Sequence, residues 1–89
     1  MAKIKILGLN NGMPTPFDGQ YVVEYDPARP GVDPEGRPMI AHLVTTPDRA
    51  KAKEYATAAD ALRELRRSHG ERFDGKPNRP LTAFTVVIV

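Results

Sequence analysis

Residues 57–69 read Thr-Ala-Ala-Asp-Ala-Leu-Arg-Glu-Leu-Arg-Arg-Ser-His, and this stretch predicts the main helix of the chain. Thr57 is a favourable N-cap residue, and Asp60 three positions later completes the pattern of a capping box. Gly70 follows directly and is the residue that most readily takes the left-handed conformation after a helix. The sequence therefore predicts both where this helix begins and where it ends.

The apolar residues of this helix form only a narrow stripe at helical spacing. We expect Leu62 and Leu65 to be buried, because the stretch has no other large apolar side chain. A helix with so narrow a stripe is not stable alone in water and needs a sheet to pack against. Just before it, residues 48–53 predict a short helical turn with Thr46 or Asp48 as its cap. One continuous helix from Asp48 to the end of the stretch is the alternative.

Four other segments have the alternation or the β-branched composition of strands. They are residues 3–9, 20–26, 39–46 and 81–89. The third is rich in β-branched residues on both faces, so we expect it inside the sheet. The fourth carries no charge on either face, so we expect it inside the sheet or paired with a second chain. On that strand, Phe84, Val86 and Ile88 should face the helix, with Ala83, Thr85 and Val87 on the other side.

All nine prolines fall between these predicted elements. Residues 10–19, 27–38 and 71–80 are therefore expected to be loops, the second of them with no regular structure. The order β-β-β-α-β over residues 1–89 predicts a single α+β domain. It would contain a small, mostly antiparallel four-stranded sheet with one main helix packed on one face.

The composition excludes several functions. The chain has no cysteine, so it forms neither disulfides nor thiolate metal sites, and the cytoplasm is the expected compartment. The longest apolar run, at residues 84–89, is far shorter than the roughly 20 residues that cross a bilayer. The formal net charge of +2 is too small to indicate a nucleic-acid partner by itself.

The sequence offers little for catalysis or for cofactors. Ser68 is the only serine, and the neighbouring His69 cannot act as its base because adjacent residues on a helix point about 100° apart. Asp26, Asp33 and Glu35 lie in one loop but lack the spacing of a calcium-binding loop. We therefore expect a non-enzymatic protein with no metal and no cofactor.

Basic residues are concentrated around the predicted helix and the loop that follows it. This surface, residues 63–79, has an aromatic residue among its charges and would suit phosphate groups and stacked bases. We expect the helical arginines on the outer side of the helix. The candidate binding residues are Arg63, Arg66, Arg67, Arg72, Phe73, Lys76 and Arg79. Three acidic residues lie among them and reduce the net charge, so nucleic acid is the alternative partner and protein the expected one.

Two further stretches carry a resemblance. Residues 43–48 read Leu-Val-Thr-Thr-Pro-Asp, and residues 74–86 read Asp-Gly-Lys-Pro-Asn-Arg-Pro-Leu-Thr-Ala-Phe-Thr-Val. Together with Tyr-Val-Val-Glu-Tyr-Asp at residues 21–26, they resemble small uncharacterised proteins of GC-rich bacteria and their phages or prophages. The resemblance implies an accessory protein that binds a host protein, such as an inhibitor or modulator of a defence system. Contact would be made through the basic surface, the 27–38 loop or a strand edge, which could also form a homodimer.

Overall fold

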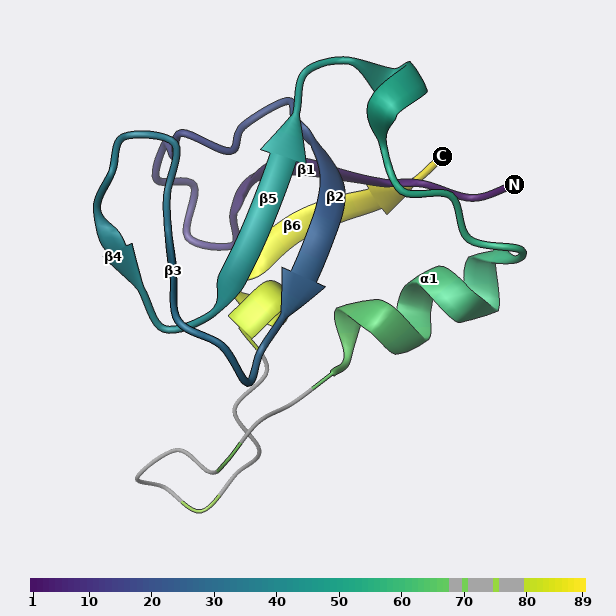
Figure 1. Ribbon diagram of the computed structural model, residues 1–89. Helices are drawn as coiled ribbons and strands as arrows, with labels where there is room; N and C mark the ends of the chain where they lie inside the picture. The colour runs from purple at the N-terminus through teal and green to yellow at the C-terminus, as the bar shows by residue number, and fades with distance from the viewer. Residues whose placement is uncertain (68–69, 71–74, 76–79) are drawn as a thin grey trace.

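The computed structural model describes residues 1–67, 70, 75 and 80–89. Its main sheet has four antiparallel strands in the spatial order β5-β2-β1-β6 (Figure 1). The strands are β1 (Ile4–Leu9), β2 (Tyr21–Asp26), β5 (His42–Thr46) and β6 (Phe84–Ile88). One helix, α1 (Ala58–Leu65), lies between β5 and β6 in sequence. The predicted α+β class and the predicted order of elements are confirmed.

The 27–38 segment contains regular structure that the sequence analysis did not predict. Its ends form a two-stranded antiparallel sheet from β3 (Gly31–Val32) and β4 (Pro38–Met39). Asp33 closes the turn between these strands, because its side chain accepts hydrogen bonds from the backbone N–H groups of Glu35 and Arg37. Pro38 lies within β4 and Pro34 in the turn, so the prolines of this segment do not prevent a short ribbon.

The core contains alternate residues of β1 together with residues of β2, β5, α1 and the connecting segments. Ile4 and Ile6 are fully buried, as the alternation with Lys3 and Lys5 predicts. In β6, Phe84, Val86 and Ile88 pack against the same core, so the predicted orientation of that strand is confirmed.

In β2 the buried residues do not alternate as they do in a regular strand. Val22 and Tyr25 are both buried, although they are three residues apart. The pairing register with β5 shifts between Val22 and Glu24, which marks a β-bulge or irregularity there. An extra residue in one strand turns the following side chains to the opposite face, and this explains why Val22 and Tyr25 share the core.

The 3₁₀ turn before α1 and helix α1 itself begin as predicted. The predicted strand 81–89 does not, because η2 (Pro80–Ala83) is a 3₁₀ turn and β6 begins only at Phe84. A single 3₁₀ turn spans Arg49–Lys51, and the Asp48 side chain accepts a hydrogen bond from the backbone N–H of Ala50. Helix α1 begins after Thr57, whose hydroxyl accepts a hydrogen bond from the backbone N–H of Asp60 at 3.2 Å. The two elements are separate, so the alternative of one continuous helix is wrong.

The end of α1 and its buried face differ from the prediction. The helix ends at Leu65, and Leu62 is 39% exposed, whereas Ala61 is fully buried. The rotation of the helix is explained by Glu64, which lies on the inner side with its carboxylate near Lys53 and Arg67. Ala61, Glu64 and Leu65 therefore share the inner face, and Leu62 is turned away from it.

One prediction about strand position is also wrong. Among the described residues, β5 is an edge strand of the main sheet, whereas it was expected inside the sheet. β6 is an edge strand too, so of its two predicted positions, inside the sheet or paired with a second chain, only the second stays open. The sequence shows how apolar a strand is but does not show its neighbours, because strand order depends on how distant segments meet. Pairing of β6 with a second chain remains a proposal.

Candidate functional site

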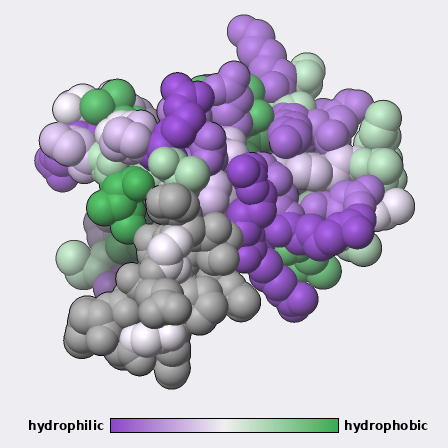
Figure 2. All heavy atoms as spheres, turned by 60° about the horizontal axis from the view of Figure 1, so that its bottom comes forward, coloured by the Kyte–Doolittle hydropathy of each residue, from purple (hydrophilic) through white to green (hydrophobic). Residues whose placement is uncertain are grey.

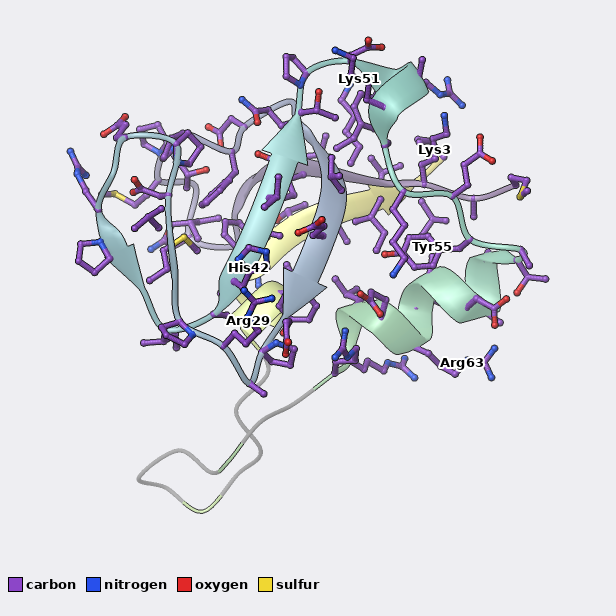
Figure 3. All side chains as sticks on the ribbon, in the orientation of Figure 1. Lys3, Arg29, His42, Lys51, Tyr55 and Arg63 are labelled. Carbon is purple, nitrogen blue, oxygen red and sulfur yellow. The ribbon has the colours of Figure 1, made fainter. Side chains whose placement is uncertain are left out.

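Only part of the predicted basic surface can be located. Arg63 and Arg66 lie at α1 with exposed side chains, and Arg63 is paired with the carboxylate of Asp60 one helical turn earlier. Arg67 lies just beyond the helix and is described below. The other four candidates lie outside the described residues: Arg72, Phe73, Lys76 and Arg79. Figure 3 shows Arg63 pointing away from the sheet on the outer side of α1.

Arg67 was expected on the outer face of the helix, but it does not lie there. Its Nη1 donates a hydrogen bond to the backbone carbonyl of Tyr25 at 2.8 Å, and its guanidinium lies 5.8 Å from the centre of the Tyr25 ring. The Tyr25 hydroxyl in turn donates to the backbone carbonyl of Arg67 at 3.2 Å. Carboxylates of Asp26 and Glu64 lie 3.9 and 3.3 Å from the guanidinium. Arg67 therefore connects the end of α1 to β2, and these contacts explain why the helix stops before the predicted residue.

We expect Arg67→Ala to lower the free energy of unfolding by about 1–2 kcal/mol. The substitution removes the hydrogen-bond donor to the Tyr25 carbonyl and the guanidinium that packs over the Tyr25 ring. The loss is limited because the side chain is 45% exposed, so its ion pairs are screened by water. Arg66→Ala is the matched control and should change stability by less than about 0.5 kcal/mol. Urea unfolding followed by circular dichroism measures both. Equal effects of the two substitutions would contradict the connecting role of Arg67.

Two buried tyrosine hydroxyls lie on the inner side of α1. Burial raises the pKa of Tyr25 and, more strongly, that of Tyr55, and the nearby Glu64 carboxylate adds to the rise in both pKa values. The Tyr55 hydroxyl has no hydrogen-bond partner within the described part of the chain. Both hydroxyls are therefore protonated and uncharged at neutral pH, as expected for tyrosines that pack in the core.

His42 and the carboxylates considered for metal binding have local partners. His42 Nε2 lies 2.9 Å from the Glu24 carboxylate across the β2–β5 pair. Asp26 accepts a hydrogen bond from the backbone N–H of Ala28, and Glu35 lies 3.0 Å from the Arg37 guanidinium. Among the described residues, no three His, Cys, Asp or Glu side chains are grouped so that they could hold a metal ion. Ser68 and His69 are outside the described residues.

A groove that the sequence analysis did not identify lies between β3 and the outer edge of β5. It has a volume of about 380 Å³ and is largely open to solvent. Its lining residues are Pro30, Gly31, Val32, His42, Leu43 and Val44. Val32 and Val44 expose 62% and 38% of their surface, and Ile40 just before β5 exposes 73%. Figure 2 shows hydrophobic side chains over the β3–β4 ribbon at the left, beside a strongly hydrophilic surface over α1.

The groove depends on a close approach of two backbones. A Cβ atom at Gly31 would lie 2.8 Å from the carbonyl oxygen of Ala41 and 2.9 Å from the Cα of His42. Only glycine permits this spacing, so the ribbon lies directly against the start of β5 and diverges from it towards Val44. The position of His42 at the start of β5 can be followed in Figure 3.

The sequence did contain a signal for this site. Val32 and Ile40 are large apolar residues within or next to a proline- and glycine-rich segment that was expected to be a loop. Such residues are usually exposed unless another element covers them. The 27–38 loop was expected to be a contact region, but the groove itself requires β5 as its second wall.

Comparison of the chain with protein-family models, with curated proteins and with solved structures gave no match. Within the described residues, no helix has the length and apolar character needed to cross a membrane.

Proposed function

We propose that the protein is a non-enzymatic binding module that takes an extended segment of a partner protein into the groove between β3 and β5. The single observation that carries this proposal is the exposure of apolar side chains on both walls of the groove, Val32 on one side and Val44 on the other. Exposed apolar surface rimmed by polar groups is typical of protein interaction sites. The resemblance to phage and prophage proteins supports a host protein as the partner.

The shape of the groove supports a protein segment over a small molecule as the occupant. Sites for small molecules enclose most of the ligand surface, whereas this groove is largely open to solvent. Its volume suits one or two apolar side chains presented by an extended chain. The surrounding residues 24–44 carry four carboxylates and two arginines. A matching segment therefore has an apolar anchor flanked by basic residues, which the acidic surplus attracts.

Selection of peptides from a random display library on the immobilised full chain tests this proposal. We expect the enriched peptides to share an apolar anchor with basic neighbours. Val32→Asp should weaken their binding by at least about tenfold, because it places a charge in the apolar wall. Met13→Asp is the matched control, since Met13 is 59% exposed and lies outside the groove. The Met13→Asp protein should bind the selected peptides with the same affinity as the unaltered protein.

Failure to enrich any peptide would overturn the proposal, and so would peptides that bind the Val32→Asp protein at unchanged affinity. Circular dichroism of both variants confirms that they are folded. A parallel titration with duplex DNA and with RNA at about 50 mM salt, where attraction to phosphates is strong, tests the alternative partner. We expect no binding in that titration.

A further inference from the structure

Among the described residues, the outer edge of β6 presents backbone groups that pair with no other strand. Lys3 and Val89 exchange both of their backbone hydrogen bonds, at 2.8 and 2.9 Å, and β6 then pairs with β1 through Val87↔Lys5 and Val86↔Ile6. Residues of an antiparallel pair alternate between those that bond across the pair and those whose N–H and C=O point away. The pattern predicts that Val87 bonds to β1, while Val86 and Ile88 direct their N–H and C=O groups away from it.

The bonding of Ile6 agrees with this alternation. Its N–H donates to the carbonyl of Gln20, and its C=O accepts from the N–H of Gly19, both on the side of β1 away from β6. In the part of the chain that the structure describes, no strand pairs with the outer edge of β6 (Figure 1). The occupant that fits this edge is therefore an extended backbone.

The two edges of the main sheet are protected differently. The ribbon strand β3 lies against the start of β5, with Gly31 in close contact with the backbone of Ala41 and His42. On β6, by contrast, residues 84–89 contain neither a charged residue nor a proline, the two devices that usually prevent pairing at an edge. Val86 and Ile88 are only partly buried although they face the core.

We propose that β6 pairs antiparallel with β6 of a second copy of this chain, so that the two sheets continue as one across a two-fold axis. A second copy fits because pairing of this strand with itself places no like charges opposite one another. Phe84, Val86 and Ile88 of each copy extend the core face of the other, and Thr85 and Val87 meet on the opposite face. The described strands β1, β2 and β5 all contain charged or histidine side chains and lack this self-complementarity.

Sedimentation velocity over a concentration series tests the pairing. We expect the mass to rise with concentration from the chain mass of 9.8 kDa to twice that value. A mass that stays at 9.8 kDa at every concentration would overturn the proposal.

Single charges on β6 test where the copies meet. Val87→Lys and Val87→Glu should each remain at the mass of one chain, because like charges then lie close together at the axis. An equal mixture of the two variants should recover twice the chain mass through Lys–Glu pairing. Val44→Lys is the matched control at the other edge of the sheet, and it should assemble as the unaltered protein does. Loss of assembly by Val44→Lys but not by Val87→Lys would place the contact elsewhere and overturn the proposal.

Amide hydrogen exchange of the unaltered protein provides a measurement that needs no variant. The amides of Val86 and Ile88 should exchange slowly at high concentration and rapidly on dilution, whereas the amide of Val87 stays protected throughout by β1. Fast exchange of Val86 and Ile88 in the assembled protein would overturn the proposal. Because the groove lies at β5, and β5 and β6 are opposite edges of the main sheet, the peptide test and the assembly test can fail separately.

Discussion

Replacing Phe17 with alanine should lower the free energy of unfolding by about 3–5 kcal/mol, a large share of the stability of a domain of this size. Phe17 lies in the segment between β1 and β2 and is only 4% exposed. Its ring meets that of Phe84 edge to face, with centres 5.7 Å apart. Loss of the ring removes this aromatic contact and leaves a cavity between the segment and β6. Urea unfolding followed by circular dichroism measures the effect.

Met13→Ala is the control for Phe17→Ala, because Met13 lies in the same segment but is 59% exposed. It should change stability by less than about 0.5 kcal/mol. Phe17→Leu should recover part of the loss, since leucine fills much of the same volume. Equal losses for Phe17→Ala and Met13→Ala would mean that the segment does not contribute to the core.

Replacing Ile6 with alanine should lower the free energy of unfolding by about 2–5 kcal/mol. Ile6 is fully buried in the centre of the sheet, between β2 on one side and β6 on the other. A truncated side chain there leaves a cavity that the flanking strands cannot close without losing their own hydrogen bonds. Thermal and urea unfolding, monitored by the same optical signal, measure the change.

Leu7→Ala provides a matched control from the next residue of β1. Leu7 is 51% exposed and lies where the pairing register of β1 with β6 shifts, between Ile6 and Gly8. Its truncation should cost less than about 0.5 kcal/mol. Similar losses at both positions would contradict the assignment of Ile6 to the inner face.

Several features were correctly predicted because their causes act within a few residues. The hydroxyl of Thr57 reaches an N–H only three positions away, so the start of α1 can be read directly from the sequence. The same is true of Asp48 at the 3₁₀ turn and of the alternation that buries Ile4 and Ile6. These local rules were enough to predict the α+β class and the number of strands in the main sheet.

The candidate site was less predictable, since its two walls come from different parts of the chain. Val32 could be recognised as an exposed apolar residue of the 27–38 segment, but the groove exists only where Gly31 meets the backbone of Ala41. The predicted basic surface is only partly located. Arg63 is exposed as predicted, whereas Arg67 donates a hydrogen bond to the backbone carbonyl of Tyr25, forty-two positions earlier in the chain.

By itself the sequence determined the segments that form the four strands of the main sheet, the start of α1 and the inward residues of β1 and β6, because propensity, capping and alternation are local. The tertiary structure alone decided the strand order, the shift in β2 that buries both Val22 and Tyr25, and the rotation and end of α1. The stripe of small and large apolar residues on α1 is compatible with more than one rotation. Contacts of Glu64 and Arg67 with distant residues select the rotation that buries Ala61 and exposes Leu62, and such contacts exist only in the folded chain.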